Sequence, residues 1–222
     1  MGNNHNNTRR YIDITSLAQQ LGQQLCAALP GYHAFTGNDY TASFFRKGKL
    51  RPLAIMEAKF INTFAALGES ENLDAELVTS LESYVCNLYG KPNLKSVDDA
   101  RYKLFSQHFA PKKNSKPLEK LKGSDSTNFP PCKIVLMEKI KRSNLVASIY
   151  KRANTCDPHL WKPKNNGWIL EDGKYRIKWF AGNQVPDAVT HQIEDTFEDE
   201  IDEELRITYD SASDESDNDL DL

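Results

Sequence analysis

The sequence predicts a mainly α-helical body that carries one small β-hairpin and ends in an acidic tail. Three observations lead to this fold class. Apolar side chains recur every three or four residues in several segments, which is typical of amphipathic helices. One stretch, at about 167–180, shows the alternating pattern of a strand-turn-strand unit. Beyond about residue 187 the chain is rich in acids and poor in aromatic residues, a composition that predicts disorder.

The first part of the chain predicts a series of helices. Three short helices are expected over residues 16–21, 23–29 and 30–36, and Pro30 suits the first turn of the third one. Two longer helices are expected over residues 51–67 and 72–88, because their apolar positions are spaced by three and four and a glycine follows each of them.

The second part is less regular. Ser96-Val-Asp-Asp99 resembles a capping box and predicts a helix over 97–109. Residues 110–131 are rich in lysine and lack periodicity, so they predict a surface loop. A last helix is expected over 132–153. The dipeptide Asp172-Gly173 predicts the turn of the hairpin, which must pack on the helical body because a lone hairpin is marginal in water.

We therefore divide the chain into residues 11–68, residues 69–186 and the tail, residues 187–222. The charge is unevenly distributed: residues 191–222 hold 14 acids and one base, whereas residues 1–190 hold 27 bases and 17 acids. A basic body attracts polyanions, so DNA is a candidate partner. The tail is expected either to recruit a basic protein, to compete for the basic body, or simply to keep the protein soluble.

Composition also bears on the compartment. The four cysteines are far apart in the sequence and form no CxxC motif, which favours reduced thiols in an intracellular, nuclear or cytoplasmic protein. No apolar run approaches the roughly 18 residues that span a bilayer, and the first residues do not resemble a signal peptide. We therefore expect no membrane partner. The sequence does not predict an oligomeric state.

The corner Gly37-Asn-Asp39-Tyr40 places a carboxylate just after a helix. A basic segment follows at once, with Arg46, Lys47, Lys49 and Arg51 around Gly48. Mg²⁺ sites that act on nucleic acid need several hard oxygen ligands, and one Asp does not make such a site. The alternative is that Asp39 is a local cap that bonds to nearby backbone.

A family resemblance rests on the same residues. Leu21-Gly22, Leu25-Cys26 and His33-Ala-Phe-Thr-Gly-Asn-Asp39-Tyr40 resemble the segment of flap endonucleases and xeroderma pigmentosum G nucleases that holds their Gly-x-Asp-Tyr motif. The resemblance covers about 45 residues and implies a PIN-like α/β domain that binds two Mg²⁺ ions through a cluster of acids.

By this resemblance Asp39 is a partial metal ligand, and the earlier acids of the family would lie before residue 1. The chain is then the C-terminal part of such a nuclease without its catalytic half, no residue is assigned as catalytic, and Mg²⁺ is a cofactor only if the site is completed upstream. The family's helix-hairpin-helix motif grips duplex DNA; here its place is taken by Phe45–Arg51, which has one glycine and several bases.

A wider resemblance covers most of the body. Segments of it are similar to a multicopy group of uncharacterised animal proteins linked to mobile elements, whose longer members resemble the same nucleases in their first half. The segments that carry this similarity are Arg10–Glu57, Leu81–Gly90, Leu136–Tyr150 and Gly167–Gly173.

Other residues are weaker candidates for phosphate or base contacts. Lys112 and Lys113 belong to a basic loop over Lys112–Lys122. Five bases of the last predicted helix either contact phosphates or form a solvated face: Lys139, Lys141, Arg142, Lys151 and Arg152. Three tryptophans among lysines either stack on nucleobases or contact the core: Trp161, Trp168 and Trp179. His33, and the pair Cys156 and His159, favour structural roles over catalysis or zinc binding.

These observations lead to three hypotheses. The first is a catalytically incomplete, nuclease-related protein that binds nucleic acid through its basic body. The second is a Mg²⁺-dependent, structure-specific nuclease completed by a longer chain or a partner. The third is a protein–protein adaptor that acts through its acidic tail. Enzymatic activity of the chain by itself is not expected, because two-metal catalysis needs the full ligand set.

Overall fold

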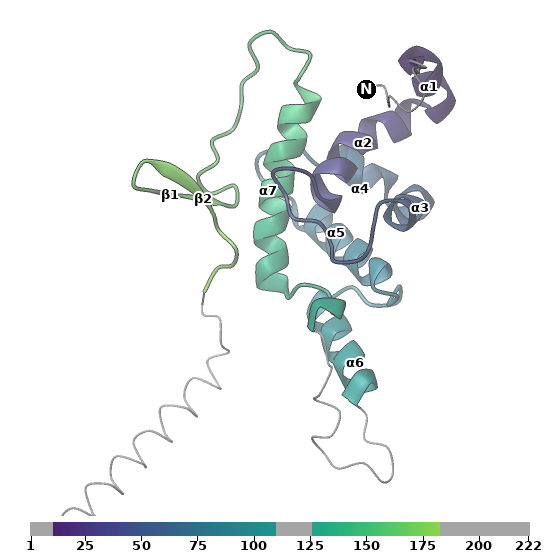
Figure 1. Ribbon diagram of the computed structural model, residues 1–222, viewed down its shortest axis with the longest axis vertical. Helices are drawn as coiled ribbons and strands as arrows, with labels where there is room; N and C mark the ends of the chain where they lie inside the picture. Colours follow the sequence, from purple (N-terminus) through teal and green to yellow (C-terminus); the bar gives the residue numbers. More distant parts are fainter. Residues whose placement is uncertain (1–10, 110–125, 183–222) are drawn as a thin grey trace, which may run out of the picture. The chain divides into compact units, whose positions relative to one another are not determined.

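The computed structural model describes residues 11–109 and 126–182 (Figure 1). The N-terminal residues 1–10, most of the expected basic loop with Lys112 and Lys113, and the expected tail over 187–222 lie outside the described residues. The described residues up to Ala181 belong to one compact unit.

Within these residues the chain is mainly helical and carries one two-stranded antiparallel hairpin, as predicted. In chain order the elements are α1 (Ile14–Leu21), α2 (Gln23–Thr36), α3 (Leu50–Lys59), α4 (Ile61–Ala66), α5 (Ala75–Leu88), α6 (Val97–Phe109), the 3₁₀ turn η1 (Ser126–Asn128), α7 (Lys133–Lys151), β1 (Trp168–Glu171) and β2 (Lys174–Ile177).

An aromatic cluster forms the centre of the core, where α2 packs against α4 and α7 and α5 closes the other side. The ring of Phe64 on α4 lies 4.8 Å from that of Tyr84 on α5, 5.8 Å from Phe35 and 5.9 Å from Tyr32 on α2. Gly31 allows α2 and α4 to approach closely, because a Cβ at this position would collide with the carbonyl oxygen of Phe64. One hydrophobic cluster thus joins side chains from both predicted regions of the body.

The helix boundaries differ from the prediction at two places. Residues 23–36 form the single helix α2, with Pro30 inside it, instead of two short helices. Proline costs a helix about 3 kcal/mol, and packing of α2 against two neighbours outweighs this cost. Conversely, the helix expected over 51–67 divides at Phe60, which has non-helical backbone angles and separates α3 from α4.

Helix α7 is buried along most of its length although many of its side chains are polar. These side chains bond to the backbone of segments that pass over the helix. Asn144 accepts from the N–H of Gly68 (2.7 Å) and donates to the carbonyl of Ser70 (2.8 Å). Arg142 donates to the carbonyls of Gly167 (3.2 Å) and Lys178 (2.5 Å). Helix α7 therefore holds connecting segments in place by satisfying their backbone groups.

The hairpin has the predicted turn. Asp172 and Gly173 both have positive φ, 51° and 73°, as a two-residue type I′ turn requires. Trp168 pairs with Ile177, and Leu170 pairs with Tyr175, so the apolar positions share one face of the hairpin. Trp168 packs against the hydrophobic core and Arg142 binds the ends of the hairpin, which confirms that the hairpin packs on the helical body. In the view of Figure 1 the hairpin lies to the left of α7 and α2–α5 to its right.

Candidate nucleic-acid interface

The Gly37–Thr41 corner is a compact turn held by its own side chains. Asn38 Oδ1 accepts from the N–H groups of Tyr40 (2.7 Å) and Thr41 (3.0 Å), and Thr41 Oγ1 donates to the carbonyl of Ala34 (2.5 Å). Gly37 has φ 113°, and a Cβ there would lie 2.5 Å from Ser43 Cα. Only glycine fits this position without strain.

Asn38 and Thr41 supply the side-chain bonds that close this turn, and the neighbouring Asp39 is exposed. Asn38 thus makes the capping bonds that the alternative assigned to Asp39. Two ring side chains lie near this corner, His33 on α2 and Tyr150 on α7, and their centroids are 5.7 Å apart. Burial raises the pKa of Tyr150, and the negative charge of Asp39 raises it further. Burial lowers the pKa of His33, and the positive charge of Lys49 lowers it further, whereas Asp39 acts in the opposite direction.

Asp39 is the predicted metal ligand. Within residues 11–109 and 126–182, no three His, Cys, Asp or Glu side chains lie close enough together to hold a metal ion. Since Mg²⁺ at a phosphate needs several carboxylate oxygens, the residues around Asp39 do not fit a two-metal site by themselves.

The basic segment after the corner forms a turn, which we call the basic turn and define as residues 45–51. Two of its lysines make contacts inside the molecule. Lys49 Nζ donates to Thr36 Oγ1 (2.7 Å) and to the carbonyl of Gly37 (2.6 Å), so it latches the turn to the end of α2. Lys47 Nζ lies 4.0 Å from the centroid of the Tyr89 ring. Burial lowers the pKa of both lysines.

The two arginines of the basic turn face solvent. Arg46 has φ 55° and its guanidinium lies 4.8 Å from the ring centroid of Phe45, while Arg51 lies in the first turn of α3. Gly48 has φ 60° and open space around the position of a Cβ. None of the ion pairs among the described residues includes a base of the basic turn. The structure thus brings together all the predicted nucleic-acid contacts from Arg46 to Arg51.

Lys139 lies beneath this region and joins it to α7. Its Nζ donates to the carbonyl of Ala42 and lies 5.5 Å and 4.8 Å from the ring centroids of Phe35 and Phe44. Burial lowers the pKa of Lys139 to about 7, and the positive charges of Arg142 and Lys49 contribute to this shift.

This pKa predicts a pH dependence of stability. The ordinary pKa of lysine is 10.5, so the unfolded chain binds more protons than the folded chain between pH 7 and pH 10.5, and stability must rise with pH across this window. We expect the free energy of unfolding of the wild type to rise relative to that of Lys139→Met, by up to about 1.4 kcal/mol per pH unit. Urea denaturation at several pH values measures both. Parallel pH profiles for the two proteins would contradict the prediction.

The bases of α7 were predicted to contact either phosphate or solvent, and the structure engages most of them inside the fold. Lys139 and Arg142 are buried and bind carbonyl oxygens. Lys141 pairs with the buried carboxylate of Glu138 (2.9 Å). The signal that could have indicated this is the absence of an uninterrupted apolar face on a helix of this length.

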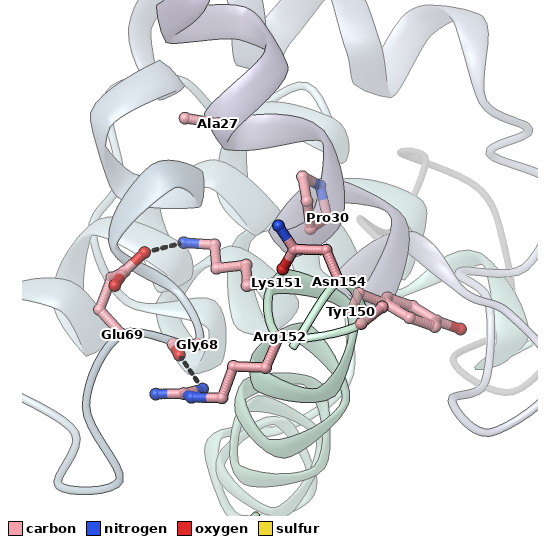
Figure 2. A pocket seen from close by; sticks show the side chains of 9 residues that line it. Ala27, Pro30, Gly68, Glu69, Tyr150, Lys151, Arg152 and Asn154 are labelled. Carbon is pink, nitrogen blue, oxygen red and sulfur yellow. Dashed lines mark hydrogen bonds and ion pairs between the residues drawn. The ribbon is translucent and has the colours of Figure 1, made fainter. Parts of the chain in front are cut away.

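The last two bases of this set line an open pocket of about 570 Å³ at the end of α7 (Figure 2). Lys151 Nζ pairs with Glu69 (2.6 Å), and Arg152 donates to the carbonyl of Gly68 (3.2 Å) and stacks on Trp161 (5.1 Å). Both charges are therefore already engaged by acceptors of the same chain, which makes this pocket a weaker anion site than the basic turn.

A second groove, of about 380 Å³, borders the basic turn, and the sequence did not predict it. Its walls come from the 42–45 segment, the 129–131 segment, α7 and Trp179, which lies two residues after the end of β2. Phe45 is 43% exposed and Trp179 is 53% exposed, although both line the groove. We call it the aromatic groove.

Neither a protein-family model, nor a curated protein, nor a solved structure matches this chain. The candidate site is therefore described by its own features. It is an exposed basic turn beside an aromatic groove, on a helical body. In the part of the chain that the structure describes, no helix is long and apolar enough to cross a membrane.

Proposed function

We propose that this chain binds nucleic acid through the basic turn and is a catalytically incomplete relative of PIN-like nucleases. The observation that supports binding is the pair of exposed arginines, Arg46 and Arg51, on one turn that includes no ion-paired base. Arginine side chains that do not pair with acids remain available to phosphate oxygens. The incomplete metal site rests on the resemblance around Asp39.

The basic turn is preorganised for contacts to phosphates. Lys49 is fixed by Thr36 and Gly37, so the path of the turn is defined before a ligand binds. Its neighbours Arg46 and Arg51 are then presented from a preorganised segment, which reduces the ordering cost of binding. Residues 1–190 carry ten more bases than acids, and such an excess favours association with any polyanion.

The two arginines are expected to contribute to the salt dependence of binding. In fluorescence anisotropy titrations with labelled DNA, the Arg46→Ser/Arg51→Ser variant should bind more weakly. The slope of log K against log salt should decrease in magnitude by about 2, because each lost phosphate contact removes about 0.9 for duplex DNA.

The control is Lys59→Ser/Lys95→Ser, which makes the same change in net charge at exposed positions outside the basic turn. It should leave the slope close to that of the wild type. Equal slopes for the two double variants would refute the basic turn as the phosphate contact. Among the described residues, no observation favours either the completed nuclease or the adaptor over this function.

A further inference from the structure

We propose that the aromatic groove binds an unpaired nucleobase of a strand whose phosphates lie on the basic turn. This inference rests on the proposed function and adds the class of ligand, single-stranded nucleic acid. It assigns a role to Trp179, which the sequence marked as an aromatic residue among bases. The other two tryptophans have different places: Trp168 packs against the core and Trp161 stacks on Arg152.

The groove offers flat apolar surfaces at its mouth. Phe45 and Trp179 both line it and both keep about half of their surface accessible to solvent. Phe129 and Pro131 add further apolar surface to the wall. Rings of this kind stack on nucleobases, and the stacking tolerates any base because every base has a π-face.

A guanidinium group lies against each of the two exposed rings. The guanidinium of Arg46 lies 4.8 Å from the ring centroid of Phe45, and that of Arg142 lies 5.5 Å from that of Trp179. Arg142 is itself held by the carbonyls of Gly167 and Lys178, so the position of Trp179 is supported from α7. The ring of Trp179 is thus positioned from α7, and the ring of Phe45 lies beside the guanidinium that we propose for phosphate.

The charge of the groove is compatible with an anionic ligand, although its bases also donate to carbonyl oxygens of the chain, so the basic turn supplies the main phosphate contact. Among the described residues, the charged ones that line the groove are Arg101, Lys139 and Arg142, and all three are basic. Lys47 Nζ lies 4.0 Å from the ring centroid of Tyr89, which also lines the groove. A ligand that combines an aromatic ring with a negative charge fits both properties, and a nucleotide has both.

The adjacency of the two sites favours a single strand over a duplex. Phe45 belongs to the groove and to the basic turn at once, and Arg46 is the next residue. A strand that contacts Arg46 through a phosphate would therefore place an adjoining base near Phe45. Bases in a duplex are stacked on their neighbours, so only an unpaired base can offer its faces to Phe45 and Trp179.

The test uses the full chain and three labelled probes: a 12-nucleotide oligo(dT), the same oligomer with abasic sites at its central positions, and a 12-base-pair duplex. Phe45→Ala and Trp179→Ala should each bind oligo(dT) about tenfold more weakly, in the lower half of the range for one stacked base. Both variants should bind the duplex as the wild type does. The wild type should bind the abasic probe about tenfold more weakly than oligo(dT), and this difference should disappear in the variants.

Trp161→Ala is the matched control, because it removes a tryptophan that stacks on an arginine outside the groove. It should leave all three affinities unchanged. Tryptophan fluorescence gives a second readout: oligo(dT) should quench the wild type and Trp161→Ala, and the quenching should be lost in Trp179→Ala.

The outcomes separate the two proposals. If oligo(dT) and duplex bind in a manner that depends on Arg46 and Arg51, but Phe45→Ala and Trp179→Ala bind oligo(dT) as tightly as the wild type, the groove proposal is overturned and the proposed function stands. If none of the three probes binds to the wild type, the proposed function fails and the groove proposal fails with it.

Discussion

Replacing Phe64 by alanine is expected to lower the free energy of unfolding by about 3–5 kcal/mol, the usual cost of removing a large aromatic side chain from a core. The Phe64 ring is fully buried and meets the rings of Tyr32, Phe35 and Tyr84. Its loss leaves a cavity between α2, α4 and α5. Because Gly31 already brings the backbone of α2 against α4, these helices have little freedom to close the cavity.

Tyr84→Phe is the control for this variant. It keeps the neighbouring ring and removes only the hydroxyl that donates to the carbonyl of Pro52 (3.0 Å), so it should cost about 1 kcal/mol. Urea denaturation followed by far-UV circular dichroism measures both variants. If Phe64→Ala were no less stable than Tyr84→Phe, the aromatic cluster would not be the centre of the core.

Arg142→Met is expected to have the second largest effect, a loss of about 3 kcal/mol of unfolding free energy. Methionine approximates the length of the arginine stem but donates no hydrogen bonds. The carbonyls of Gly167 and Lys178 would then lose a charged donor in a buried place, and each such group costs about 1–3 kcal/mol. The hairpin should also loosen from α7, which hydrogen exchange of the β1 and β2 amides would detect.

Arg176→Met is the comparison for Arg142→Met. Arg176 pairs with Glu171 within the hairpin, but its side chain is 63% exposed, and an exposed pair contributes less than about 1 kcal/mol. Faster exchange in Arg142→Met and unchanged exchange in Arg176→Met would support the role of α7 in holding the hairpin. Equal stability of the two variants would show that the hairpin does not depend on Arg142.

The local elements of this protein were predictable where one short pattern decides them. The Asp172-Gly173 dipeptide defined the hairpin turn because few residues adopt positive φ at both positions. The capping box at Ser96 predicted the start of α6, and Asp99 N–H donates to Ser96 Oγ at 3.3 Å. The two boundary errors, at Pro30 and at Phe60, arose where packing between helices overrides local preference.

The candidate site was predictable only in part. The basic turn from Arg46 to Arg51 is contiguous in sequence, so its charge was visible directly. That Lys49 serves as a latch while Arg46 and Arg51 remain exposed depends on where the end of α2 lies. The aromatic groove joins Phe45 to Trp179, residues from opposite ends of the body, and no periodicity relates them.

The sequence by itself determined the fold class, the hairpin, the acid-rich composition of the C-terminal region and the presence of a basic segment after Gly37. Each of these follows from neighbouring residues, through hydrogen bonds along the backbone or through the local density of charge. Tertiary structure decided which basic side chains remain accessible to solvent. It buried Lys139 and Arg142 against carbonyl oxygens and left Arg46 and Arg51 in solvent. The reason is that a buried cation needs an acceptor to replace water, and those acceptors are brought to α7 by segments distant in sequence.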